Sequence, residues 1–266
     1  MQIRRKAMAL PIHQFIDIHE YTGSDIVPVS VPVSAEYAFT FMLNGSPYMT
    51  FASSGSGLES YALGHLISEG IVTGKQDIKS ITVNEEERII NIVPHNDRNV
   101  SRKLSELVNV TAAGGKSRRE LPPRERERRE LPVIDARIIC RCAGDFLAYS
   151  NEHDLTHGVH SAALFGLTGD RKAFFDDIGR HNAVDKIIGF AAAGEMSWNE
   201  NMLFTTGRIS SEITFKIINS DASVLVSRAS PTSFAVELAR MYNLLVIARA
   251  RGAGFWIING RDRVTF

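Results

Sequence analysis

Arginine side chains follow three consecutive hydrophobic segments in the C-terminal part of the sequence. Arg208 comes shortly after NMLFTT, Arg228 directly after ASVLVS, and Arg249 and Arg251 after LLVIA. Each segment has the length and the apolar content of a buried strand. Because a guanidinium group presents a fixed fork of N–H donors that matches phosphate oxygens, the pattern predicts a site for a phosphate- or pyrophosphate-containing ligand.

The segments around these strands have the pattern of helices. Residues 182–193, 210–219 and 230–242 are predicted helices, with Asn182 and Ser230 as N-caps and Pro231 at the first helical position. Strands that alternate with helices predict an α/β fold, in which helices cover a mostly parallel or mixed sheet. In such sheets ligands bind beyond the carboxyl ends of the strands, where the free N–H groups of helix N-termini favour anions.

Two more loop features are expected at the same edge of the sheet. The loop GRHNAV brings Arg180 and His181 to the start of the helix at 182–193. The loop ARARGAG carries Gly252 and Gly254, which allow the backbone to approach a ligand closely. Both features agree with an anion site built from several loops.

Other interpretations of these residues stay open. Any single arginine is compatible with an ordinary surface position, and only the repetition after three strands favours a site. His160 and His181 are candidate acids, bases or ligands, but a single histidine near a helix start is more often structural. Asp176 and Asp177, at the end of KAFFDDI, would either face a substrate or cap the turn that follows.

The two cysteines lie in a predicted helix that follows an N-cap at Asp135. Cys140 and Cys142 form a C-x-C pair, but helix positions two apart point in different directions, so they cannot readily chelate one metal or form a disulfide. Cys142 falls on the apolar face and is expected in the core. Cys140 lies between arginines, which lower a thiol pKa, and is the candidate for a reactive thiol. No bound metal is expected, because no cysteine–histidine spacing for zinc occurs.

The rest of the chain predicts a smaller N-terminal domain and a charged connection. Residues 1–112 are expected to form an α+β domain, with a hairpin turn at Asn44-Gly45, a helix that ends near Gly70, and a second hairpin over 78–93. Residues 113–131 are expected to be a charged linker or mobile loop, either solvated or lying over a cleft. Residues 132–266 form the predicted C-terminal domain.

Composition narrows the class of protein. Lysine and arginine number 30 and so do aspartate and glutamate, so the formal net charge is zero and nothing favours a nucleic-acid or membrane binder. Two cysteines give no disulfide framework, which fits a reducing compartment. The N-terminal residues have no apolar run typical of a signal peptide. The cytoplasm is the expected location.

Five segments of the C-terminal part occur in an order and spacing that resemble the formate dehydrogenase accessory (FdhD) family. They are THGVHSAALFG, DDIGRHNAVDKIIG, TTGRISSEITFK, SRASPTSFAVELA and LLVIARARGAGFWI. The segments FTFMLNGSPYMTF and SGSGLESYALGHLISEGIV are similar to the N-terminal domain of the same family.

This resemblance implies a sulfur carrier that serves formate dehydrogenase. Such a protein accepts sulfur as a persulfide from a cysteine desulfurase and passes it to the molybdenum (or tungsten) bis-guanine-dinucleotide cofactor. The resemblance also implies a homodimer, and a C-terminal domain of cytidine-deaminase-like fold without zinc. Ser161 and Ala162 follow His160 here, where a zinc deaminase needs a glutamate. The family's cofactor-binding segment, for which GDP is a mimic, falls on Arg249, Ala250, Arg251, Gly252, Ala253 and Gly254.

One segment departs from the family pattern. The family carries a CGxCG-type loop whose cysteine bears the persulfide, whereas residues 111–116 of this chain read TAAGGK. Two hypotheses follow: a sulfurtransferase that uses Cys140 or another route, or a cofactor-binding chaperone or regulator without sulfur transfer. Whether the chain is an enzyme therefore stays open. A nucleotide-processing enzyme on a deaminase-like scaffold is a third interpretation, which rests on fold analogy alone.

Overall fold

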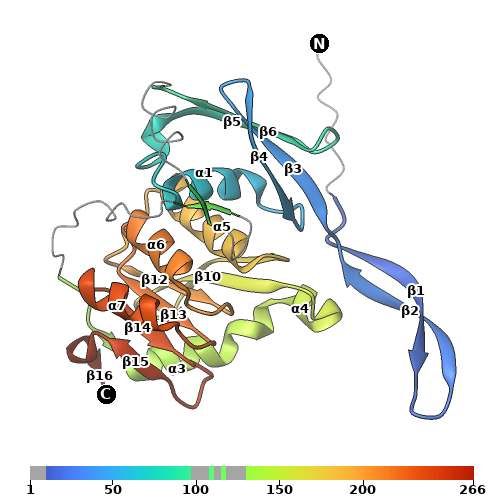
Figure 1. Ribbon diagram of the computed structural model, residues 1–266. Coiled ribbons are helices and arrows are strands. Elements are labelled where there is room, and N and C mark those ends of the chain that lie inside the picture. The colour runs from blue at the N-terminus through green and yellow to red at the C-terminus, as the bar shows by residue number, and fades with distance from the viewer. Residues whose placement is uncertain (1–9, 97–107, 111–114, 118–129) are drawn as a thin grey trace.

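The computed structural model describes residues 10–96, 108–110, 115–117 and 130–266 (Figure 1). The predicted charged linker at 113–131 lies mostly outside the described residues, as do residues 111–114 of the segment that replaces the family's cysteine loop. On either side of residues 111–114, the structure places two short paired strands, β7 (Val108–Val110) and β8 (Gly115–Ser117).

The N-terminal part is built on a four-stranded sheet of order β4-β3-β6-β5. Its strands are β3 (Tyr37–Leu43), β4 (Ser46–Ser53), β5 (Ile78–Asn84) and β6 (Ile89–Pro94), and α1 (Leu58–Ser68) packs against it. Asn44 and Gly45 have positive φ angles of 49° and 79°, which confirms the predicted tight turn. Gly70, with φ of 68°, follows α1 as predicted.

A second, longer hairpin precedes this sheet. It consists of β1 (His13–Tyr21) and β2 (Ile26–Ser34), which pair along their whole length. Figure 1 shows it extending away from both sheets. The sequence did not predict the strand β1.

The C-terminal part contains a six-stranded mixed sheet of order β11-β10-β12-β13-β14-β15. The strands β12, β13 and β14 are parallel to one another, and β10 is antiparallel to both of its neighbours, β11 and β12. It follows that β11 runs in the same direction as β12–β14. The sheet comprises β10 (His160–Gly166), β11 (Arg171–Asp177), β12 (Asn201–Thr205), β13 (Val224–Ser227), β14 (Leu245–Ala248) and β15 (Trp256–Asn259).

Helices cover both faces of this sheet, which confirms the predicted mixed sheet between helices. One face packs against α5 (Arg180–Ala193), α6 (Ser211–Asn219) and α7 (Ser233–Met241), and the other against α3 (Ala136–Asp145). Side chains of each strand alternate between the two cores. Leu203 and Leu225 face α5–α7, whereas Phe204 and Val226 face α3.

The remaining elements are short and lie mainly around α3 and the chain end. The expected helix after Asp135 is interrupted at Phe146, where a 3-10 turn begins. These elements are η1 (Lys75–Asp77), β9 (Ile134–Asp135), η2 (Phe146–Tyr149), α4 (Asn151–Thr156), η3 (Arg261–Arg263) and β16 (Val264–Thr265). No helix in the described part of the chain is long and apolar enough to cross a membrane.

Two predicted helix starts are wrong. The helix α5 begins at Arg180 after Gly179, so Asn182 lies inside its first turn and its side chain bonds elsewhere. The helix α7 begins at Ser233, and its cap is Thr232, whose hydroxyl accepts from the Ala235 N–H. Pro231 instead forms a β-bridge with Ile209, which keeps residues 230–231 extended.

The two parts of the chain share one hydrophobic core. Helix α1 of the N-terminal part packs along α5 of the C-terminal part, so the order of layers is four-stranded sheet, α1 with α5, six-stranded sheet, α3. The predicted domain boundaries at 112 and 132 stay a prediction.

Candidate functional site

The carboxyl ends of β11, β12, β13 and β14 lie at one edge of the six-stranded sheet, because these strands run in the same direction. The loops that leave them carry the arginines that the sequence singled out. We call this feature the arginine edge, and it comprises Arg180, Arg208, Arg228, Arg249 and Arg251.

Hydrogen bonds join the neighbouring loops of the arginine edge to one another. The Ser227 hydroxyl donates to the Gly207 carbonyl at 2.6 Å, which joins the loops after β12 and β13. The Arg249 N–H donates to the Ala229 carbonyl at 3.0 Å and thereby joins the loops after β13 and β14. Arg180 adjoins the loop after β12, since a Cβ placed on Gly207 would lie 2.9 Å from the Arg180 Cβ. The four loops therefore form one continuous surface.

Arg228 and Arg251 are direct neighbours on this surface. The Arg251 Nε donates to the Arg228 carbonyl at 3.4 Å, and the Arg228 Nη1 donates to the Ala143 carbonyl at the end of α3 at 2.8 Å. Partial burial lowers the pKa of Arg228, and the charge of Arg251 lowers it further. Two cations held side by side in this way favour a bound anion between them.

The loop after β14 presents both side chains and backbone. Arg249 adopts a positive φ of 52° and its guanidinium lies 4.7 Å from the centre of the Trp256 ring. Ala250 is buried, so its methyl group belongs to the core and only its backbone can face a ligand. Gly252, with φ of 84°, packs against α3, where a Cβ would lie 3.2 Å from the Gly144 Cα. Gly254 borders open space, and Ala253 is exposed.

Arg208 lies in the loop after β12, apart from the contact between Arg228 and Arg251. Its side chain is exposed, and its carbonyl accepts from the Ser210 N–H at 3.1 Å. Ser210 is the N-cap of α6. The starts of α5, α6 and α7 all lie at this edge, and their free N–H groups and dipoles favour negative charge there.

His181 lies next to Arg180 in the first turn of α5. Its Nε2 is 3.1 Å from a carboxylate oxygen of Glu212 in α6. Burial nevertheless lowers the pKa of His181 to about 3, and the nearby charges of Lys216 and Arg180 act in the same direction. We therefore expect a neutral imidazole at this position at neutral pH.

His160 also lies at the arginine edge, a position that the sequence pattern did not reveal. His160 is the first residue of β10 and does not begin a helix. Because β10 is antiparallel to β11 and β12, this first residue lies beside the carboxyl ends of those two strands. The His160 Nδ1 is 3.1 Å from the Thr206 hydroxyl oxygen, which also accepts from the Ser161 N–H. Burial lowers the pKa of His160, and Arg180 lowers it further.

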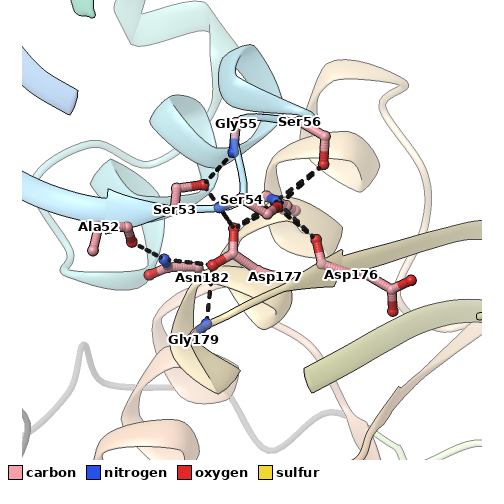
Figure 2. A network of polar contacts seen from close by, with 10 residues as sticks. Ala52, Ser53, Ser54, Gly55, Ser56, Asp176, Asp177, Gly179 and Asn182 are labelled. Atoms are coloured by element: carbon pink, nitrogen blue, oxygen red, sulfur yellow. Dashed lines mark hydrogen bonds and ion pairs between the residues drawn. The ribbon is translucent and has the colours of Figure 1, made fainter. Parts of the chain in front are cut away.

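A buried polar network holds the turn that carries Arg180 and His181 (Figure 2). Asp177 accepts from the Gly179 N–H at 3.0 Å and from the Asn182 side chain at 2.9 Å, which shows it in the turn-capping role. Its other oxygen pairs with the Lys186 Nζ at 2.6 Å, and both side chains are fully buried. Within the C-terminal part, Asp177 thus fixes the start of α5.

The same network reaches into the N-terminal part. The Ser53 hydroxyl at the end of β4 donates to Asp177 at 2.7 Å, and Asn182 donates to the Ala52 carbonyl at 2.7 Å. Figure 2 shows these contacts on the turn between β4 and α1. The turn that follows β11 is therefore held from both parts of the chain. The sequence motif DDIGRHN contains the C-terminal half of this network, but nothing in the sequence indicates its serine partners.

The adjacent Asp176 points to different partners. Its carboxylate accepts from the hydroxyls of Ser161 and Ser150, each at 2.7 Å. Burial raises the pKa of Asp176, while these hydroxyls oppose that shift. Asp176 is thus fully engaged in joining β10 and β11 to the segment before α4.

The two cysteines differ in their surroundings. Burial raises the pKa of Cys142 to about 11, and this side chain packs in the core as expected. Cys140 is partly exposed, and its carbonyl lies 3.9 Å from the position that a Cβ on Gly252 would take. Helix α3 therefore brings the backbone of Cys140 next to the glycine loop of the arginine edge. Among the described residues, no group of three His, Cys, Asp or Glu side chains could hold a metal ion.

A mixed sheet between helices, with cationic loops beyond its carboxyl edge, is the architecture of α/β proteins that bind ligands at a sheet edge. Residues 34–265 match the model of the FdhD/NarQ family. The chain belongs to the FdhD/NarQ family.

Individual relatives agree with this assignment. The sulfur carrier protein FdhD of Bacillus licheniformis is 27% identical over 253 residues, which cover 94% of this chain and 96% of the relative. Protein FdhD of Methanocaldococcus jannaschii is 30% identical over 240 residues, or 90% and 93% of the two chains. A crystal structure described as a formate dehydrogenase accessory protein of Desulfotalea psychrophila has the same fold. Its TM-score is 0.77 at 21% identity, with 96% of this chain and all of that chain covered.

Proposed function

We propose that this chain is a cytoplasmic formate dehydrogenase accessory protein that binds the molybdenum bis-guanine-dinucleotide cofactor as cargo at the arginine edge. The observation that carries the proposal is the pairing of Arg228 and Arg251 beside the glycine loop, at an edge where three helices begin. Membership of the FdhD/NarQ family supports the choice of cofactor and client.

The chemistry of the edge suits the phosphates of this cargo. Arg228 and Arg251 supply fixed N–H forks, and the first turns of α6 and α7 supply backbone N–H groups. The exposed backbone around Gly254 leaves room for a ligand to approach. The neutral His160 and His181 add hydrogen-bonding groups without adding charge.

Calorimetric titration with GDP, a fragment of the cofactor, tests this binding role. Replacing Arg251 or Arg228 with Ala is expected to weaken GDP binding by roughly 1–3 kcal/mol, or about 5- to 150-fold, the scale of a lost charge-assisted hydrogen bond. Arg171→Ala is the matched control, because Arg171 begins β11 and so lies at the opposite edge of the sheet. Unchanged affinity in Arg251→Ala would count against the arginine edge.

Salt provides a second readout in the same titrations. Ions screen partly exposed charges, so raising the salt concentration should weaken GDP binding if guanidinium groups hold the phosphates. A salt-independent affinity would indicate a mainly apolar site instead.

Sulfur carriage is a second candidate function, favoured by the partial exposure of Cys140 and by the proximity of its backbone to the glycine loop. The sulfur carrier relatives support it. In this step the Cys140 thiol loses its proton and attacks the terminal sulfur of a cysteine desulfurase persulfide. The S–S bond on the desulfurase breaks, one forms on Cys140, and the desulfurase thiolate leaves, so there is no net oxidation. Cys142 is unsuited, because its raised pKa keeps it protonated at neutral pH.

Persulfide loading distinguishes the two candidates. The protein is incubated with a cysteine desulfurase and cysteine, and its intact mass is measured. A mass gain of one sulfur atom that disappears in Cys140→Ser and persists in Cys142→Ser supports sulfur carriage. No gain, in a protein that binds GDP, leaves a cofactor-binding chaperone or regulator without sulfur transfer.

A further inference from the structure

Trp256 places an indole ring beside the arginine edge. It is the first residue of β15, the outermost strand of the six-stranded sheet, and it pairs with Ala248, the last residue of β14. Residues 249–255, which include Arg249 and Arg251, form the loop between these two strands. Because β15 is antiparallel to β14, it begins at the edge of the sheet where β14 ends (Figure 1). The ring therefore lies at the base of the loop that carries the glycines.

One face of the Trp256 ring is covered and the other is open. The Arg249 guanidinium lies 4.7 Å from the ring centre, yet Trp256 is 50% exposed. Ile258 points to the same side of the sheet, since it follows two positions later in the strand, and it packs against the core. Trp256 does not share this burial. Because Arg249 covers one face of the indole, the exposed part of the ring includes the other face.

The backbone holds Arg249 in the position from which it covers the ring. The φ angle of 52° lies in the left-handed region, which costs a residue other than glycine free energy and occurs often at ligand sites. The Arg249 N–H donates to the Ala229 carbonyl, and the Ala250 N–H donates to the Ser227 carbonyl, each at 3.0 Å. The loop after β14 is thus anchored on the loop after β13, and the orientation of the indole is fixed before any ligand binds.

The indole and the anion-binding groups belong to the same loop. Arg249 contacts the ring, and Arg251, two positions later, contacts Arg228. A ligand whose phosphates lie against Arg228 and Arg251 therefore has its neighbouring group close to Trp256. Indole rings bind flat aromatic rings by stacking, which needs no particular pattern of hydrogen-bonding groups. A ring that is already oriented loses little conformational entropy when it binds.

An ordinary surface pair of a cation and an aromatic ring is the alternative interpretation. The described residues contain four such pairs, and the rings of the other three are Tyr37, Tyr149 and Phe266. None of these three rings follows a loop of the arginine edge. The pair of Arg249 and Trp256 is the one whose arginine belongs to that edge, which favours a role in ligand binding.

We propose that Trp256 is the stacking platform for the nucleobase of the ligand whose phosphates the arginine edge binds, and that Arg249 positions the indole for this contact. The inference rests on the proposed function and deepens it, because it names the part of the ligand that lies beyond the phosphates. It follows that the site binds a nucleoside diphosphate more tightly than inorganic pyrophosphate.

Calorimetric titration of the full chain with GDP and with inorganic pyrophosphate separates the two contributions. Trp256→Leu removes the ring but keeps an apolar side chain, and it should weaken GDP binding by about 5- to 150-fold, the scale of one stacked base. The same variant should leave pyrophosphate binding unchanged. Trp256→Tyr keeps a ring and should recover most of the lost affinity for GDP. Arg251→Ala should weaken the binding of both ligands.

Tryptophan fluorescence reports on stacking without removing the ring. The chain has two tryptophans, and Trp198 precedes β12, so it lies at the opposite edge of the sheet. In Trp198→Phe the only indole is Trp256, and GDP should quench its fluorescence with the midpoint found by calorimetry, because stacking on guanine allows electron transfer from the excited ring. Pyrophosphate should cause no quenching. In Trp256→Phe, the fluorescence of Trp198 should not respond to GDP.

The outcomes distinguish a failure of this inference from a failure of the proposed function. If neither GDP nor pyrophosphate binds the unmodified chain, the anion site at the arginine edge is wrong and the stacking platform falls with it. If both bind and Trp256→Leu weakens both equally or neither, the stacking platform alone is wrong. GDP that binds to Trp198→Phe without quenching Trp256 overturns the stacking platform as well, whatever the affinities of the other variants.

Discussion

Gly64 of α1 and Gly189 of α5 face each other where the two helices cross, at a distance that excludes any side chain. A Cβ on Gly64 would lie 1.8 Å from the Asp185 carbonyl oxygen, and one on Gly189 would lie 1.8 Å from the Ser60 carbonyl oxygen. The backbones of the two helices are therefore in direct contact. This crossing joins the N-terminal part to the helix that begins with Arg180 and His181.

Replacing Gly64 with Ala should destabilise the protein strongly. The new methyl group would overlap a backbone carbonyl, so the helices must separate, and we expect a loss of at least about 3 kcal/mol in the free energy of unfolding, the upper part of the range for overpacking. Urea denaturation measures it. Gly144→Ala is the control, because its Cβ would make only ordinary contact at 3.7 Å in another helix. That control should be neutral or stabilising by up to about 1 kcal/mol, as helix propensity dictates. Equal effects would contradict the close crossing.

Removing the Asp177 carboxylate should uncouple the turn before α5 from both parts of the chain. Asp177→Ala leaves the buried Lys186 ammonium without its ion-pair partner and removes one of the two acceptors of the Asn182 amide. Breaking one side of a buried pair costs about 3–5 kcal/mol, to be read from urea denaturation. The comparison is Lys172→Ala, which removes a surface pair with Asp170 and should cost about 0–1 kcal/mol. A loss below 1 kcal/mol in Asp177→Ala would show that the network does not hold the turn.

The buried His181 should make the protein less stable in mild acid. Its pKa is about 3 in the folded chain and about 6.5 in an unfolded one, so the unfolded state binds more protons between these values. The free energy of unfolding should therefore fall as the pH decreases below about 6.5, by up to about 1.4 kcal/mol per pH unit. In His181→Gln this slope should be smaller by up to about 1.4 kcal/mol per pH unit, the contribution of one proton. An unchanged slope between pH 6.5 and 5 would argue that His181 is charged in the folded chain.

The two thiols should react at different rates in the folded protein. Cys142 is buried and its pKa is raised to about 11, so little thiolate forms at neutral pH. Cys140 is partly exposed. We expect an alkylating reagent to modify one thiol quickly, the Cys140→Ser variant to lack this fast reaction, and both thiols to react after unfolding in denaturant. Mass spectrometry of the modified chain identifies the site, and equal rates for both cysteines would contradict the buried position of Cys142.

Local sequence signals predict much of the C-terminal part. Alternating apolar segments and helical periodicity predict the strands β12, β13 and β14 and the helices α5, α6 and α7. These signals are local, because each strand or helix buries its own apolar side chains. The predicted cap at Asn182 was wrong by three residues and the one at Ser230 by two, since Gly179 and the Ile209–Pro231 bridge set where those helices begin.

Which side chains meet depends on contacts between segments that are distant in the sequence. The sequence places arginines after successive strands, but the contact between Arg228 and Arg251 depends on the neighbouring order of β13 and β14. The buried Ser53–Asp177 contact joins residues that are 124 positions apart, and no local pattern marks such a pair. Residue types and spacing therefore determined what chemistry this chain can do, whereas sheet order, helix crossing and burial decided where that chemistry is assembled, because these depend on contacts between distant segments.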